Sequence, residues 1–133
     1  AMDKLRSRVA QTFLARGATT IAVTSSLGDE GKALTAFGLA SSLTLAGFKT
    51  LLLDFDLRSP ALHPHAGVPN QDGVCELLTG AVDHRRAMIV LANGLHFVPA
   101  GALSEDARAP AVGDRLAGLI AALAQQFDCV VLH

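Results

Sequence analysis

The sequence contains no tryptophan and no tyrosine, and only six of its 133 residues are phenylalanine. Because half of the residues are hydrophobic, the core must be built mainly from Ala, Leu and Val. No apolar run reaches the ~18 residues that a membrane-spanning helix requires. We therefore expect a globular domain that is not inserted directly into a membrane.

Charged residues are also scarce, at 17% of the chain, and the 11 Lys and Arg nearly balance the 12 Asp and Glu. Because the sequence has no excess of positive charge, nucleic acid is not an expected partner. Only two cysteines are present, Cys75 and Cys129, each among apolar neighbours. This pattern favours reduced thiols over a disulfide and predicts a cytoplasmic protein, which would contact a membrane only through a partner.

Strand-like and helix-like patterns alternate along the chain. They predict an α/β domain with a doubly wound, mostly parallel sheet and helices on both faces. Strands are expected at 19–26, 49–56, 94–101 and 128–133, and helices at 3–15, 31–46, 73–80, 83–88 and 112–126. Residues 1–133 are interpreted as one domain, and as a fragment of a longer chain because the last residues read as an unfinished element.

Two of these elements have further signals. Within the stretch 49–56, the run Leu51, Leu52 and Leu53 is apolar without alternation, which predicts a central strand. Gly47 is expected to end the helix at 31–46. Residues 57–73 are rich in Pro and Gly and are predicted to form a loop with a turn of helix.

The stretch VTSSLGDEGKALTAFGLA, residues 23–40, predicts a strand, a glycine-containing loop and a helix. Glycines let a backbone wrap an anion, and a helix N-terminus offers unpaired amides, so Lys32 would reach the phosphates of a nucleotide. The residues expected at this nucleotide are Gly28, Asp29, Glu30, Gly31, Lys32, Ala33, Leu34 and, from a later loop, Arg58. The alternative is a plain turn with an exposed lysine, since Ser26 replaces the first glycine of the pattern G-x-x-x-x-G-K-[ST].

Residues 23–63 resemble the bacterial tyrosine kinases, P-loop autokinases that act with polysaccharide copolymerases in capsule and exopolysaccharide export. The residues matching the family patterns T-S-x-x-P-G-E-G-K and K-T-L-L-I-D-x-D-L-R-x-P-x-x-H are Thr24, Ser25, Glu30, Gly31, Lys32, Lys49, Thr50, Asp54, Asp56, Leu57, Arg58, Pro60 and His63. The segments NQDGVCELLTG, GLHFVPAG and FDCVVLH resemble later parts of the family, so the resemblance covers nearly the whole chain.

The resemblance implies a P-loop NTPase-like fold that binds ATP or ADP with Mg²⁺. It implies catalytic roles for Lys32, Asp54 and Asp56, with the two aspartates also in the metal shell. Two residues apart on a strand, the aspartates are expected to point to the same side. The alternative is that they cap a strand end, with Arg58 as a neutralising partner.

Several departures from the family pattern fall on the metal-binding positions. Ala33 and Leu34 replace hydroxyl residues, and His133 stands where an aspartate is usual. Gly28 and Asp29 replace Pro-Gly. Because magnesium prefers oxygen ligands, we expect nucleotide binding to persist and turnover to be weak or absent.

Three functions remain open at this point. The chain is a weakly active kinase domain, a non-catalytic module that docks on a membrane polysaccharide copolymerase, or an ATPase of the partitioning and septum-positioning type. The third lacks support because Leu27 occupies the place of the signature lysine of that class.

Two further features each have two interpretations. The helix at 3–15 carries Arg6, which matches the family's self-association motif, but Asp3 replaces an arginine, so a solvated helix face is the alternative. His63 and His65 are interpreted as surface groups rather than metal ligands.

Overall fold

The computed structural model describes residues 20–22, 29–102 and 112–133. Within these ranges five strands form one sheet in the order β1-β5-β2-β4-β3. They are β1 (Thr20–Ala22), β2 (Thr50–Leu53), β3 (Ile89–Val90), β4 (His96–Val98) and β5 (Cys129–Leu132). In this part of the sheet the pairs β1–β5, β5–β2 and β2–β4 are parallel, and β3 pairs antiparallel with β4.

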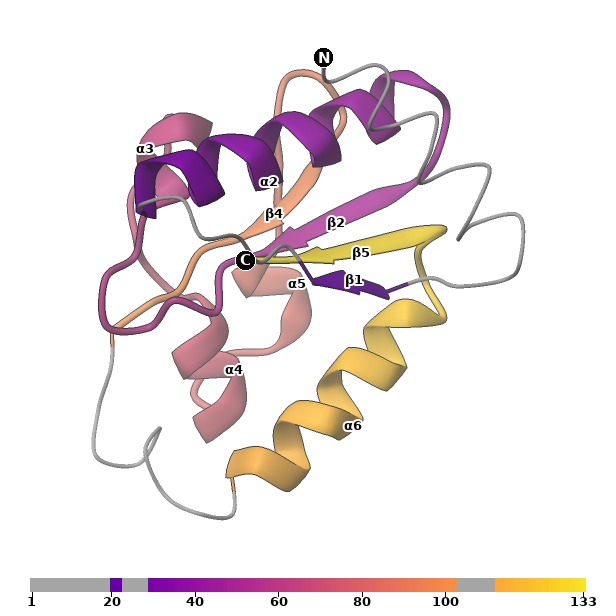
Figure 1. Ribbon diagram of the computed structural model, residues 1–133. Coiled ribbons are helices and arrows are strands. Elements are labelled where there is room, and N and C mark those ends of the chain that lie inside the picture. Colours follow the sequence, from indigo (N-terminus) through magenta and orange to yellow (C-terminus); the bar gives the residue numbers. More distant parts are fainter. Residues whose placement is uncertain (1–19, 23–28, 103–111) are drawn as a thin grey trace.

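Helices cover both faces of the sheet. The described helices are α2 (Asp29–Leu45), α3 (His63–Ala66), α4 (Val74–Thr79), α5 (His84–Ala87) and α6 (Val112–Ala124). The long helix α2 lies across one face, and α4 and α6 lie on the other (Figure 1). The predicted doubly wound, mostly parallel α/β fold is therefore confirmed.

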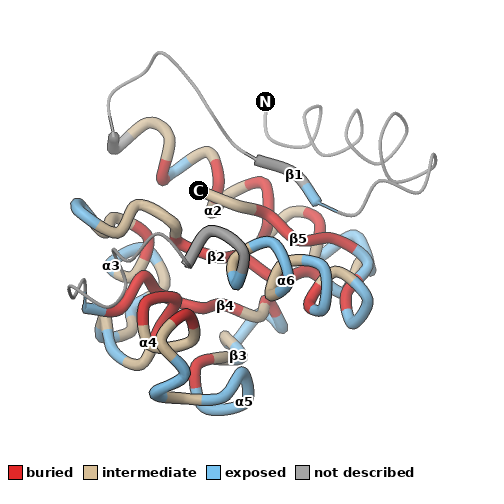
Figure 2. Tube along the Cα trace, turned by 90° about the horizontal axis from the view of Figure 1, so that it is seen from below, coloured by how far each residue is buried: buried red, intermediate tan, exposed pale blue. Residues whose placement is uncertain are grey.

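Strand β2 separates two hydrophobic cores. Leu52 packs in the core under α2, whereas Leu51 and Leu53 pack in the core under α4 and α6. Successive side chains of a strand point to opposite faces, so a strand covered on both sides is apolar throughout. This explains why its sequence does not alternate, and the prediction of a central strand is confirmed. Figure 2 shows mainly buried residues along β2 and β5.

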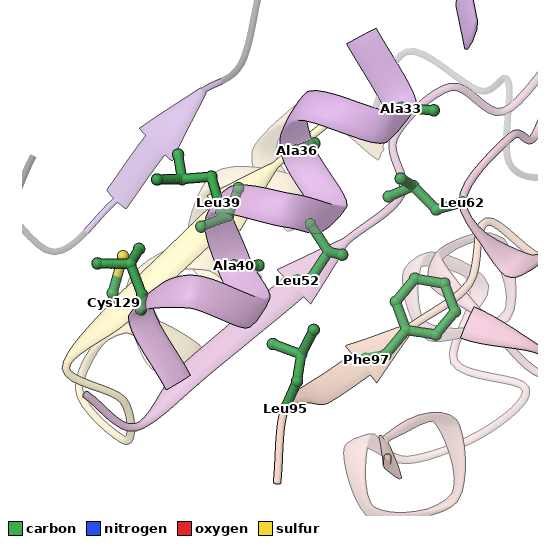
Figure 3. Packing of buried hydrophobic residues seen from close by; sticks show 11 residues of the cluster. Ala33, Ala36, Leu39, Ala40, Leu52, Leu62, Leu95, Phe97 and Cys129 are labelled. Carbon is green, nitrogen blue, oxygen red and sulfur yellow. The ribbon is translucent and has the colours of Figure 1, made fainter. Parts of the chain in front are cut away.

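Small residues line the face of α2 that meets the sheet. Ala33, Ala36 and Ala40 have no exposed surface, and they recur at helical spacing. Figure 3 shows them facing Leu52 and Leu62. Because alanine extends only a methyl group from the helix, α2 can lie close against the strands.

Gly47 ends α2, as predicted. It has a positive φ of 98°, a backbone conformation that favours glycine. Its N–H donates to the carbonyl of Thr44 at 3.1 Å, and the N–H of Phe48 donates to that of Leu43 at 3.1 Å. These bonds satisfy the last carbonyls of the helix. The helix begins at Asp29, two residues earlier than predicted.

The edge of the sheet differs from the prediction. The sequence predicts no strand at Ile89–Val90, yet these residues pair antiparallel with β4. Two residues are too few to display a period-two pattern, so this strand leaves no sequence signal. The strand predicted at 94–101 is limited to His96–Val98. The predicted helix at 3–15 lies outside the described residues.

His96, at the start of β4, predicts a pH dependence of stability. Its ring meets the edge of Phe127, with ring centroids 5.0 Å apart. Burial and, second, the charge of Lys49 lower the pKa of His96 below its ordinary 6.5. The folded state therefore favours the neutral ring, and the resulting stability is present above pH 6.5 and is lost as the pH falls through the folded-state pKa.

Urea unfolding between about pH 8 and about pH 5 tests this expectation. The wild type should lose more free energy of unfolding on acidification than His96→Phe, which keeps the ring contact. His84→Gln, on the exposed helix α5, should follow the wild type. Equal losses in the wild type and in His96→Phe would contradict the assignment.

Both cysteines, predicted to be reduced thiols, are free and buried in the structure. Burial and, second, the nearby charge of Asp128 raise the pKa of the Cys129 thiol to about 12. A thiol with this pKa is protonated at neutral pH and therefore unreactive.

Candidate functional site

The predicted site lies where the parallel strands end. The carboxyl ends of β1, β5 and β2 are neighbours, since Ala22 pairs with Leu132 and Leu132 pairs with Leu53. Helix α2 begins at the same end of the sheet (Figure 1). In open α/β sheets this edge is where ligands bind.

The first turn of α2 supplies the phosphate-binding part of the predicted site. Lys32 and Gly31 lie in this turn and are partly buried. Asp29 and Glu30 open the helix, and Gly28 lies outside the described residues. A 17-residue helix presents unpaired amides and a positive dipole end here, which suits the anionic phosphates of a nucleotide.

The two positions after the lysine behave differently. Ala33 is completely buried and packs in the core with Leu52 and Leu62. Leu34, in contrast, is 60% exposed on the outer face of α2. Neither side chain carries an oxygen, so this turn contributes no side-chain hydroxyl for a metal ion.

Asp54 follows β2 directly and has no exposed surface. Its Oδ1 accepts the N–H of Asp56 at 3.0 Å and lies 3.3 Å from Nδ1 of His133. Its Oδ2 accepts the N–H groups of Ala61 and Leu62, each at 3.2 Å. The carboxylate thus joins the end of β2 to the following loop and to the end of β5.

Asp56 lies in a different environment, although it is close to Asp54. The chain bends out of the sheet after Phe55, whose carbonyl accepts the N–H of Leu57 at 2.9 Å. Asp56 is partly exposed, and its Oδ1 accepts the N–H of Ser59 at 3.2 Å. The strand predicted at 49–56 ends at Leu53, so Asp54 and Asp56 follow β2 rather than lie on it, and Asp54 is the one of the two that is fully buried. The prediction that both side chains point to the same side stays a prediction.

Arg58 is exposed on the loop after β2. The ion pairs found in the described ranges join Arg86 to Asp72 and His133 to Asp54. Arg58 forms neither of them, so the alternative in which it neutralises the two aspartates has no support. Its predicted contact with a nucleotide stays a prediction.

His133 extends β5 beside Asp54. Its N–H donates to the carbonyl of Leu53 at 3.0 Å, and its carbonyl accepts the N–H of Phe55 at 2.9 Å. Its side chain is 4% exposed, and Nε2 has no hydrogen-bond partner in the described part of the chain. The sequence marked this position as a lost carboxylate but did not reveal its pairing with Asp54. One signal for this pairing was present in the sequence. LLLDF and VVLH both have strand patterns, and neighbouring parallel strands of one sheet end at the same edge.

The remaining histidines of interest do not converge on a metal. His65 is exposed and its ring lies 6.1 Å from that of Phe37, whereas His63 is partly buried. In the parts of the chain that the structure covers, no group of three or more His, Cys, Asp or Glu residues is arranged to hold a metal ion.

Comparison with known proteins identifies the family. Residues 21–132 match the CobQ/CobB/MinD/ParA nucleotide binding domain. The chain belongs to this family. The match includes the strand ends, the first turn of α2 and the loop after β2 described above.

Two curated relatives narrow the relationship within this nucleotide-binding family. The succinoglycan biosynthesis transport protein ExoP of Rhizobium meliloti (strain 1021) is 35% identical over 82 residues, which is 56% of this chain and 10% of ExoP. EpsB of Ralstonia solanacearum, which is assigned to the tyrosine-protein kinases, is 25% identical over 99% of this chain and 18% of its own length. The chain therefore spans less than a fifth of either relative.

Solved structures confirm the fold. The kinase domain of the Escherichia coli tyrosine kinase ETK superposes with a TM-score of 0.89 at 22% identity, covering 99% of this chain and 52% of that domain. The septum site-determining protein MinD of Pyrococcus horikoshii, solved with Mg-ADP, has a TM-score of 0.72 at 22% identity, covering 86% and 47%. The predicted relationship to bacterial tyrosine kinases and polysaccharide-transport proteins is thus confirmed.

Proposed function

We propose that this chain is an ATP- or ADP-binding domain that acts in capsule or exopolysaccharide export, with little or no kinase turnover of its own. The observation that carries the proposal is the position of Lys32 in the first turn of α2, at the sheet edge where β1, β5 and β2 end. An ammonium group and helix amides suffice to bind phosphates. Ala33, directly after Lys32, carries a buried methyl group where a hydroxyl would bind a metal ion, and this argues against efficient phosphoryl transfer.

The proposed partner is the cytoplasmic part of a membrane polysaccharide copolymerase. Support comes from the similarity to ExoP and EpsB. In the described ranges no helix is long and apolar enough to cross a membrane. On this proposal the domain lies in the cytoplasm and reaches the membrane through its partner. Nucleotide binding would then regulate export rather than drive phosphorylation.

Calorimetric titration with ADP and ATP tests the proposed binding site. Lys32→Ala should weaken affinity by about 1.5–3 kcal/mol, or roughly ten- to 150-fold, because it removes a charged hydrogen-bond donor from the phosphates. Lys49→Ala is the matched control, because it also removes one lysine charge. Lys49 lies over the Phe127 ring and directly precedes β2, so it is at the opposite end of the sheet. This variant should bind as the wild type does. Equal affinity in Lys32→Ala, or no binding by the wild type, would refute the proposed function.

Turnover is measured separately from binding. Release of phosphate from ATP by the wild type should stay near the uncatalysed background. An efficient ATPase or kinase activity that Lys32→Ala abolishes would show that this domain is catalytic, and would replace the regulatory proposal by an enzymatic one.

A further inference from the structure

The Asp54 carboxylate has no acceptor capacity left for a metal ion. A carboxylate offers two lone-pair positions on each oxygen. On Oδ1 they are used by the N–H of Asp56 and by His133, whose Nδ1 lies 3.3 Å away and donates in the tautomer that carries the proton on Nδ1. On Oδ2 they are used by the N–H groups of Ala61 and Leu62. The group is also fully buried, so no solvent path leads to a free oxygen.

A metal ion could take Asp54 only by breaking this network. Two of its donors, the amides of Ala61 and Leu62, hold the loop that leads into α3. Leu62 is completely buried and packs against Ala33 in the core under α2, where its amide would find no water to replace the carboxylate. A buried N–H without a partner is strongly unfavourable, so the structure opposes the exchange.

The neighbouring positions do not compensate. Ala33 and Leu34 carry no oxygen ligand, and His133 already uses Nδ1 on Asp54. Among the described side chains of the loop after β2 and of the end of β5, Asp56 keeps a carboxylate oxygen that accepts no hydrogen bond from the described residues. Magnesium in nucleotide sites is held by one or two carboxylates together with phosphates and water, and of the Asp54 and Asp56 pair the structure leaves only Asp56 with an oxygen for it.

We infer that the nucleotide binds here without a divalent cation held by the protein. The inference rests on the proposed function and deepens it, since it states which form of the ligand the site takes. Lys32 and the amides at the start of α2 neutralise the phosphates, and the Asp54–His133 pair occupies the place that the family relationship would give to metal ligands.

Calorimetry in matched buffers tests the inference. ADP and ATP are titrated into the protein with excess Mg²⁺ and, separately, with EDTA. The two affinities should agree within about twofold, whereas ligands coupled through a protein change each other's affinity by roughly 5–150-fold. Lys49→Ala, outside the site, should show the same small difference between the two buffers. Asp56→Asn, which keeps the oxygen that accepts from Ser59, is titrated in both buffers to show whether Asp56 holds a cation.

The outcomes separate the two claims. Tighter binding in Mg²⁺ by about fivefold or more, and loss of that gain in Asp56→Asn, would overturn the inference while the proposed nucleotide-binding function stands. If binding is tighter in Mg²⁺ and stays so in Asp56→Asn, the inference is overturned as well, because residues other than Asp56 then hold the cation. No binding in either buffer would overturn the proposed function and this inference with it.

Discussion

Replacing Asp54 by asparagine should lower the free energy of unfolding by about 3–5 kcal/mol. Asparagine has one accepting oxygen and one NH₂ group, so it cannot accept the four hydrogen bonds that the carboxylate receives. In either orientation its NH₂ group faces donors, which include the amides of Ala61 and Leu62 on one side. Since single domains are stable by about 5–15 kcal/mol, this is a large share of the total.

Urea denaturation followed by far-UV circular dichroism measures the effect, with Asp56→Asn as the control. Asp56 is partly exposed and accepts one hydrogen bond that asparagine can also accept, so the control should stay within about 0.5 kcal/mol of the wild type. If Asp54→Asn were as stable as Asp56→Asn, the buried carboxylate could not be the anchor of the loop after β2.

Gly73→Ala should have an effect of similar size, a loss of about 3 kcal/mol or more. A Cβ atom at Gly73 would lie 2.0 Å from the carbonyl oxygen of Pro99 and 2.6 Å from the amide nitrogen of Gly101. Both are backbone atoms and cannot rotate away. Relief would require separating the start of α4 from the chain after β4, which breaks the 2.8 Å bond from the N–H of Val74 to Pro99.

The matched control is Gly118→Ala, in the middle of α6. A Cβ atom there meets nothing within 4 Å, so alanine should raise stability by about 0.5–1 kcal/mol through its higher helix propensity. Thermal and urea unfolding of both variants compare the same chemical change at a crowded and an open position. Similar stabilities for the two variants would contradict the close packing of α4 against the chain after β4.

The sequence predicted those features that depend on residues close together in the chain. Gly47 ends α2 because a single residue must adopt a positive φ, and glycine at that position is visible in the sequence. The central place of β2 follows from its uninterrupted apolar run, since both of its faces are covered. Lys32 was placed in the first turn of a helix because a strand pattern, a glycine-containing loop and a helix pattern follow one another.

What the sequence could not provide depends on contacts between distant segments. The pairing of His133 with Asp54 joins residues 79 positions apart, and no spacing rule reaches across that interval. The saturation of the Asp54 carboxylate depends on how the loop to Leu62 folds back, which sequence patterns do not specify. Strand β3 exists because β4 offers it an edge, and its two residues have no pattern of their own.

The strand order also determines when the domain can form during synthesis on the ribosome. In the described sheet β1 pairs only with β5, and β5 inserts between β1 and β2 although it follows both of them in the sequence. While β5 is still inside the exit tunnel, the nascent chain has no neighbour for β1, and the anchor beside Asp54 lacks His133. Such long-range parallel pairing is slow, so the emerging segment would depend on chaperones until β5 is released from the tunnel.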